Sequence, residues 1–431
     1  MQLKDLGYAA ICLSTLFACN GSDAAGPRGE VDAATAGAAT GLTFHRDVRA
    51  CVARRQLRRC LRKLRWLNAD VAAGECPDRL SPMQDRLPAR VVVLVNADFE
   101  SRKDELQREG PRAYEADAAV LDTANAVRAA IASLGIDVHE QRVTSSLSGV
   151  VPALKHRKVD VVFNLVESID NDYGREWQVP ALLERHAIAY TGNAALPLKL
   201  CRQKDKARKV LHKAGVRVAP GFAVASAAEL NAHVVKDMDY PLFVKPARVD
   251  GSIGIDRSSI VYDANALRER VALLEQTLPG PYLVEAYLPG KEINVAIFPG
   301  PVSGEVVPTE IDFSPVPGDV PPIITYDSKW NPESPEYASK SVPAQLSPEL
   351  RKEVEALARQ TFLALGGTGY GRVDMRLDAH GKPCVIDVNP NNDIHPEAGL
   401  ALAAQSLGWD YPRLIASVLA HAFDLSRAGG L

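Results

Sequence analysis

The stretch 371–396, GRVDMRLDAHGKPCVIDVNPNNDIHP, holds the side chains whose types and spacing best suit metal and phosphate chemistry. Arg372 and Asp374 alternate with apolar residues, as do Asp387 and Asn389, so each pair can point to one face of a strand. A hairpin would then collect three oxygen ligands beside a guanidinium group. Such hard ligands suit Mg²⁺, which binds one or two carboxylates together with substrate phosphates. The alternative, a surface hairpin, leaves polar groups on apolar paired strands without partners.

A second stretch, YPLFVKPARVDGSIGI (240–255), joins a lysine to a glycine-rich loop. Lys245 ends an apolar run, and Gly251, Ser252 and Gly254 follow it. Glycine lets backbone N–H groups approach a phosphate closely, and a lysine adds a point charge. The spacing is not that of the P-loop or of the dinucleotide-binding fingerprint. By itself, the stretch is compatible with phosphate binding or with a glycine hairpin and an exposed lysine.

The third stretch, YLVEAYLPGKEINVAI (282–297), predicts a strand, a Pro-Gly turn and another strand. Glu285 and Glu292 are its notable polar residues. A carboxylate at a strand end can accept hydrogen bonds from an adenine amino group or from ribose hydroxyls. The alternative is a half-exposed hairpin with solvated charges.

An α/β framework must position these stretches. The apolar runs at 91–96 and 159–165 predict buried strands, and the pattern at 116–134 predicts an amphipathic helix that Gly135 ends. This strand, helix, strand order indicates a parallel α/β unit. Further helices are expected at 178–186 and 202–214.

Composition excludes several classes of protein. The chain has 431 residues, of which 46% are hydrophobic and 24% charged, with a formal net charge of -3. No run of about 18 apolar residues occurs, so we expect no membrane-spanning channel or transporter. A nucleic-acid binder usually has a basic balance, which this chain lacks. Its seven cysteines are irregularly spaced, which argues against a disulfide framework.

Residues 1–87 differ from the remainder. The apolar run ending at Cys19 could be a lipoprotein leader, although its positive n-region is weak. Residues 45–67 could form a basic amphipathic helix that binds a membrane surface or a partner. We favour a poorly ordered or dispensable extension, with Met83 as the true start, and a cytoplasmic protein.

In this order, the motifs resemble those of the ATP-grasp superfamily, specifically its D-alanine–D-alanine ligase branch, over about residues 90–425. The resemblance implies an ATP-grasp fold, α/β and α+β, preceded by an N-terminal parallel α/β domain. It also implies four regions: the extension 1–87, the N-terminal domain 88–195, a central small domain 196–286 and a C-terminal domain 287–431.

The resemblance also assigns roles to single residues. The ATP phosphates would be held by Lys206, Lys245 and the glycine loop at Gly251, Ser252 and Gly254. The nucleoside would face Glu285, the hinge backbone from Ala286 to Leu288, and the ribose-binding Glu292. Two Mg²⁺ ions, or Mn²⁺, would bind Asp374, Asp387 and Asn389. Lys329 on a mobile loop would reach the γ-phosphate, and Arg372 would stabilise the tetrahedral intermediate.

The implied activity is ATP-dependent joining of a carboxylate to an amine through an acyl phosphate. The substrates would be small amino acids or amines, with no nucleic acid or membrane partner, and a homodimer is possible. One alternative is another ATP-grasp ligase, making a different dipeptide or capping a natural product. The other is a nucleotide-binding regulator without turnover.

Departures from the family pattern concern the substrates. The usual N-terminal signature is replaced by VNADFES at 95–101, and the HG-type motif by FNLVES at 163–168. Where a glycine and a serine usually hold the second substrate's carboxylate, this chain has Asp393 and Glu397. We therefore expect an acceptor other than D-alanine, with a cationic or neutral group. The first substrate's amine could bind near Glu167, Arg175 and Glu176.

Overall fold

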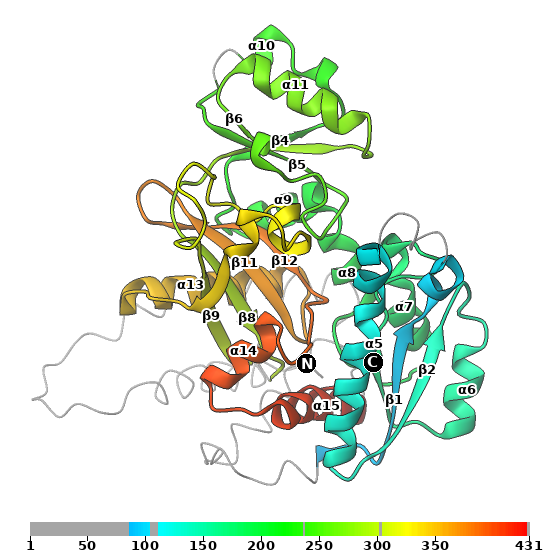
Figure 1. Cartoon of the computed structure of the whole chain (residues 1–431). Helices are drawn as coiled ribbons and strands as arrows, with labels where there is room; N and C mark the ends of the chain where they lie inside the picture. The colour runs from blue at the N-terminus through cyan, green and yellow to red at the C-terminus, as the bar shows by residue number, and fades with distance from the viewer. Residues whose placement is uncertain (1–85, 104–110, 236–237, 301–303, 429–431) are drawn as a thin grey trace, which may run out of the picture. The chain divides into compact units, whose positions relative to one another are not determined.

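The computed structural model describes residues 86–103, 111–235, 238–300 and 304–428 (Figure 1). The chain divides into two units, and the second contains all the described residues, whereas the first comprises residues 1–83. The first unit lies outside the described residues, and with it the predicted leader, basic helix and start at Met83.

A three-stranded parallel sheet in the order β2-β1-β3 opens the described part of the chain. Its strands are β1 (Arg90–Asn96), β2 (Asp137–Val143) and β3 (Val161–Leu165), with α5 (Pro111–Ser133) and α6 (Val150–Arg157) as crossovers. Apart from Arg90, β1 is buried throughout, as expected for a parallel strand covered on both faces. The predicted parallel α/β unit is thus confirmed, and Gly135 follows the helix with φ +78°.

A second sheet is antiparallel, in the order β4-β7-β5-β6. Its strands are β4 (Gly221–Val224), β5 (Leu242–Pro246), β6 (Ile260–Val261) and β7 (Tyr282–Ala286). Helix α11 (Ala264–Glu275) covers it by burying Leu267, Val271 and Leu274. Helices α8 (Ala195–Cys201) and α9 (Lys204–Lys213) precede this sheet in the chain.

The third sheet is antiparallel, in the order β10-β9-β8-β11-β12. Its strands are β8 (Glu292–Ile297), β9 (Val306–Asp312), β10 (Lys340–Pro343), β11 (Gly371–Leu377) and β12 (Pro383–Asn389). Helix α13 (Pro348–Ala364) packs on the apolar face with Val354, Ala358 and Phe362. The stretch 282–297 is therefore not a hairpin, because β7 and β8 belong to different sheets and 287–291 connects them.

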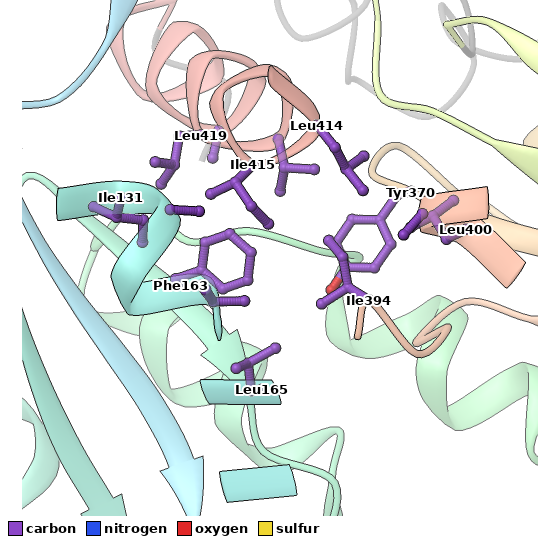
Figure 2. Packing of buried hydrophobic residues seen from close by; sticks show 14 of the residues in the cluster. Ile131, Phe163, Leu165, Tyr370, Ile394, Leu400, Leu414, Ile415 and Leu419 are labelled. Carbon is purple, nitrogen blue, oxygen red and sulfur yellow. The ribbon is translucent and has the colours of Figure 1, made fainter. Parts of the chain in front are cut away.

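One hydrophobic core joins the parallel sheet to the C-terminal helices. In Figure 2, Phe163 and Leu165 of β3 and Ile131 of α5 pack with Ile415 and Leu419 of α15 (Tyr411–Arg427). The same core includes Tyr370, Ile394 and, in α14 (Gly399–Ser406), Leu400. This packing fixes the ends of β11 and β12 relative to the parallel sheet.

Asn193 makes a polar connection at the same place. Its buried amide nitrogen donates to the carbonyls of Tyr370 (2.7 Å) and Pro390 (2.6 Å). Its oxygen accepts from the N–H groups of Thr368 and Gly369, both at 2.9 Å. A buried amide with all these bonds made specifies one arrangement of the loops that it joins.

The remaining helices are short. They include η3 (Tyr173–Arg175), α7 (Gln178–Arg185), α12 (Tyr326–Trp330) and η6 (Pro335–Ala338). Among the described residues, no helix combines the length and apolar character that crossing a membrane requires. The three sheets fall within the three predicted domains, whose boundaries at 88, 196 and 287 stay predictions.

Candidate functional site

The polar face of the hairpin β11–β12 brings the predicted metal ligands together. Asp374 lies in register opposite Asp387, and Arg372 lies opposite Asn389. The register shifts after Asp374, so that Ile386 is an extra residue in β12. All four polar side chains therefore share one face of the sheet, where they are half-buried.

Arg372 is held by two side chains of this face. Its Nε and Nη2 donate to the two oxygens of Asp374, at 2.6 and 2.9 Å, and its Nη1 donates to Oδ1 of Asn392 at 3.2 Å. Burial alone would lower the pKa of Arg372, but the Asp374 carboxylate, followed by that of Asp387, raises it. The guanidinium group is a fixed positive charge at this point of the sheet.

Asn294 on β8 adds an oxygen that the sequence interpretation missed. It lies opposite Asp374, and its Oδ1 is buried without a hydrogen-bond partner among the described residues. No group of three or more His, Cys, Asp or Glu side chains is placed to hold a metal in the described ranges. Two carboxylates with amide oxygens still fit Mg²⁺, since that ion takes other ligands from phosphates and water.

Lys204 at the start of α9 reaches the same face. Its Nζ donates to the carbonyl of Val249 (3.1 Å), pairs with Asp250 and lies 3.6 Å from Oδ2 of Asp387. Burial would lower its pKa, but Asp387 and Asp250 raise it. Burial would raise the pKa of Asp387, but Lys204 and Lys245 lower it. This lysine and carboxylate therefore stay charged.

Lys206, the lysine of this helix that we predicted to bind phosphate, lies on the exposed side of α9. It lies two residues after Lys204, where a helix has turned by about 200°, and it is exposed. Sequence interpretation missed Lys204, although a signal was present. Ala207 and Leu211 follow it at helical spacing on the buried face of α9.

Lys245 and Glu285 form a buried pair between the two antiparallel sheets. Nζ of Lys245 lies 2.9 Å from Oε2 of Glu285 and donates to the carbonyl of Ile386 at 2.8 Å. The other oxygen of Glu285 pairs with Arg208, whose guanidinium also donates to the carbonyl of Ala219 at 2.7 Å. Lys245 is 6% exposed, which excludes the hairpin with an exposed lysine.

Glu292 is buried at the other end of the polar face. It lies opposite Arg376 of β11, whose Nη1 is 3.3 Å from its Oε2. Burial raises the pKa of Glu292, and the charge of Arg376 opposes that rise. Arg376 also donates to the carbonyls of Pro322 (2.8 Å) and Gly290 (3.0 Å), a contact that ties the 313–325 segment to the sheet.

The glycine loop contacts the segment that follows β9. Gly251, Ser252 and Gly254 have φ of +67°, +61° and +74°, a region in which L-residues are strained. Ser252 Oγ donates to the carbonyl of Ile324 at 3.3 Å, and Trp330 Nε1 donates to that of Gly251 at 3.1 Å. We call residues 313–340 the lid, because they contact this loop and carry Lys329.

Lys329 on α12 belongs to the exposed part of the lid. Partial loss of hydration lowers the pKa of its ammonium group, and nearby Arg372 adds to this effect. The carboxylates of Asp374, Asp387 and Glu292 act in the opposite sense. The lid thus brings this lysine within electrostatic reach of the polar face.

The hinge 286–288 connects the two antiparallel sheets. The N–H of Ala286 donates to the carbonyl of Pro220 at 2.7 Å, and the N–H of Tyr287 to that of Pro241 at 3.1 Å. Leu288 is buried, and its N–H makes no hydrogen bond within the described ranges. Of the three hinge residues, Leu288 is thus the one that keeps a donor for a ligand.

The loop after β12 holds Asp393 and Glu397 at the surface. Both residues are exposed. Oδ1 of Asp393 accepts from the N–H of His395 at 2.8 Å, and the N–H of Glu397 donates to Nδ1 of His395 at 3.3 Å. Their negative charges are near the hairpin but solvated, which weakens their effect on a ligand.

Of the three residues expected near the first substrate, Glu176 is the one brought to this loop. Its Oε2 accepts from Nδ2 of Asn391 at 3.0 Å. The N–H of Glu167 donates to Oδ1 of Asn96 at 3.1 Å, at the carboxyl ends of the parallel strands. Arg175 instead faces its own turn and donates to the carbonyl of Ile169 at 3.4 Å.

Comparisons with known proteins show what the chain is similar to. The family model described as D-ala D-ala ligase C-terminus matches residues 211–420. The D-alanine–D-alanine ligase of Cupriavidus taiwanensis is 30% identical over 304 residues, which cover 70% of this chain and 86% of the relative. The uncharacterized protein y4sG of Sinorhizobium fredii is 29% identical over 304 residues, 69% of this chain and 86% of that protein.

A solved structure shows the same fold. The D-alanine–D-alanine ligase of Bacillus anthracis, crystallised with ATP, aligns with a TM-score of 0.59 at 20% identity. The alignment covers 79% of this chain and 100% of that one. The expected fold class, an ATP-grasp fold with an N-terminal parallel sheet, is thereby confirmed.

Proposed function

The chain belongs to the D-alanine–D-alanine ligase family of the ATP-grasp superfamily, and on that premise we propose that it joins an amino acid to an amine through an acyl phosphate. The observation that carries this proposal is the shared face of Arg372, Asp374, Asp387 and Asn389 on the hairpin β11–β12. Two carboxylates, an amide and a guanidinium side by side suit the neutralisation of charge that phosphoryl transfer requires.

ATP would lie between the two antiparallel sheets. We assign its phosphates to Lys245, to Lys204 in place of Lys206, and to the glycine loop. Glu285 and the hinge 286–288 would face adenine, and Glu292 would face the ribose. Bound Mg²⁺ supplies charge neutralisation to the phosphates, and Asp374, Asp387 and Asn389 would hold it, with Asn294 close by.

Arg372 is the residue that we assign to the acyl-transfer step. Attack of an amine on the acyl phosphate gives a tetrahedral carbon with a negative oxygen, which a fixed guanidinium stabilises. The lid would exclude water, because an acyl phosphate hydrolyses readily. Lys329 on the lid would approach the transferred phosphoryl group only when the lid is closed.

We further propose that the acceptor is not D-alanine. A carboxylate on the acceptor would meet the negative charges of Asp393 and Glu397, which favour a cationic or neutral group instead. Both side chains are exposed, so the preference should be moderate and should weaken as salt is added. Because the reaction consumes ATP, we expect it in the cytoplasm.

The test is ADP and phosphate release by the full chain with ATP, Mg²⁺ and a panel of D- and L-amino acids and amines. Product would be identified by mass spectrometry. Release that requires a particular pair, with the matching amide product, would establish the proposal and name the substrates. Efficient synthesis of D-alanyl-D-alanine would refute the acceptor argument. Tight ATP binding without release for any pair would refute ligation and favour a nucleotide-binding regulator.

A further inference from the structure

An acidic residue of the glycine loop occupies the lysine that we assign to the ATP phosphates. Asp250 directly precedes Gly251, and one oxygen of its carboxylate pairs with Nζ of Lys204. The same Nζ donates to the carbonyl of Val249 at 3.1 Å. Lys204 therefore holds both the backbone and the side chain at the start of the glycine loop.

Most of the binding capacity of Lys204 is used by these contacts. An ammonium group has three N–H donors, and Val249 and Asp250 take two of them. Oδ2 of Asp387, the proposed metal ligand, lies 3.6 Å from the same Nζ. Phosphate and carboxylate oxygens are the same kind of acceptor for an ammonium group. The phosphates of ATP must therefore compete with Asp250 for this lysine.

The Asp250 carboxylate can leave Lys204 without losing every partner. Its side chain is 48% exposed, against 9% for that of Lys204, so water can replace part of the ion pair at small cost. Its second oxygen lies 3.1 Å from Nη1 of Arg202, the residue that follows α8. Arg202 can keep the carboxylate paired after it has left the lysine. The buried ammonium group, by contrast, needs an anion beside it at all times.

We propose that Asp250 is an internal competitor of ATP, which pairs with Lys204 in the nucleotide-free protein and is displaced by the phosphates when ATP binds. The inference rests on the proposed function, in which Lys204 holds a phosphate. A phosphate bound beside the Asp250 carboxylate would be repelled by it, so the carboxylate would move toward Arg202. This movement frees the start of the glycine loop, and its reversal favours the departure of ADP.

A purely structural role of Asp250 predicts the opposite result. If Asp250 only preorganised Lys204 and the glycine loop for the phosphates, its charge would help ATP to bind. Removing the charge would then weaken ATP binding, whereas removing an internal competitor strengthens it. The sign of the change in Kd therefore separates the two roles.

The experiment measures ATP binding to the full chain by isothermal titration calorimetry, with Mg²⁺ and without a donor or an acceptor. We expect Asp250→Asn to lower the Kd for ATP by roughly 10-fold, because the charge of the competitor is lost. Asp250→Ser, a second neutral variant, should act in the same direction. Asp250→Glu keeps the charge and should stay within about twofold of the wild type. Asp239→Asn, an exposed aspartate shortly before β5, is the matched control.

A double substitution tests whether Asp250 acts through Lys204. Adding Asp250→Asn to Lys204→Ala should change the Kd by no more than about twofold, because no ammonium group remains to be competed for. An undiminished gain in affinity in this background would overturn the inference, because Asp250 would then act on the nucleotide directly. Thermal unfolding without ATP checks that each variant is folded.

The outcomes separate this inference from the proposed function. A wild type that binds no ATP refutes both. A wild type that binds ATP but releases no ADP with any substrate pair refutes the ligase function, and the Kd values still decide the role of Asp250. A Kd that is unchanged or higher in both neutral variants overturns the inference and leaves the ligase proposal intact.

Discussion

Asp374 on β11 and Asp387 on β12 are direct cross-strand partners, and each carboxylate has its own cation. Arg372, on the same strand as Asp374, binds both of its oxygens, whereas Lys204 reaches Asp387 from α9. Two like charges placed opposite each other would otherwise repel. A separate cation at each carboxylate therefore offsets the repulsion between the two side chains.

Asp387→Asn should remove the stabilisation of the protein by Mg²⁺ and ATP. A ligand present at 100 times its Kd stabilises the folded state by about 2.7 kcal/mol. In thermal unfolding, we expect Mg²⁺ and ATP to raise the Tm of the wild type, and most of that rise to be lost in the variant. Asp122 is exposed on α5, and Asp122→Asn should show the same rise in Tm as the wild type. An equal rise in both variants would contradict the proposed ligand set.

Lys204→Ala and Lys206→Ala should differ sharply in kcat/KM for ATP. We expect Lys204→Ala to lower kcat/KM for ATP by about 100-fold, because a preorganised charge at the phosphates is lost. Lys206→Ala should stay within about twofold of the wild type, since its side chain is exposed. Steady-state ADP release decides between them, and a loss confined to Lys206→Ala would reverse our assignment.

Glu176 should make folding stability depend on pH. Burial raises its pKa from the ordinary 4.5 to about 7, so the folded protein holds a proton there that the unfolded chain has released. Its contribution to the free energy of unfolding therefore falls as the pH rises from about 4.5 to about 7. Glu176→Gln should exceed the wild type in stability by about 1–3 kcal/mol at pH 8 and differ little at pH 5.

Urea unfolding at the two pH values measures this difference. Glu349→Gln serves as the exposed control and should show no pH-dependent change. A difference of the same size at pH 5 and pH 8 would mean that titration of Glu176 is not its cause.

Two glycines of the glycine loop should respond differently to replacement by alanine. In Gly254→Ala, the new Cβ would lie 2.5 Å from Cδ1 of Leu278 and 2.9 Å from Cγ of Pro246, at φ +74°. In Gly251→Ala, no atom lies within 4 Å of the new Cβ, and only the φ of +67° is unfavourable. We expect losses in the free energy of unfolding of about 2 kcal/mol or more and about 1 kcal/mol, respectively. If urea unfolding gave the two variants equal losses in the free energy of unfolding, this packing of the loop would be contradicted.

Trp330→Phe should loosen the lid. The change removes the hydrogen bond from Trp330 Nε1 to the carbonyl of Gly251, whose net value is about 1 kcal/mol. Water would then reach the acyl phosphate more often, so the ratio of ADP formed to product formed should rise above that of the wild type. Tyr337→Phe, an exposed tyrosine of the lid, is the control. An unchanged ratio would show that this contact does not control closure.

The local sequence was sufficient to predict the hairpin β11–β12. Alternation of Arg372, Asp374, Asp387 and Asn389 with apolar residues fixes which side chains share a face, because the strand period is two. Strand β1 and helix α5 follow in the same way from short-range hydrophobic patterns. The roles of these residues in catalysis stay predictions.

Other features depend on contacts between distant segments, which no local pattern encodes. Separating β7 from β8 required knowing which strands pair, and the ion pairs of Lys204 with Asp250 and Asp387 join α9 to residues far along the chain. The contact between Glu176 and Asn391 forms across 215 residues. The sequence by itself determined the polar face of the hairpin and the types of side chain on it. Only the tertiary structure decided which cations and which carboxylates from other elements surround that face, because packing of the sheets and helices sets those distances.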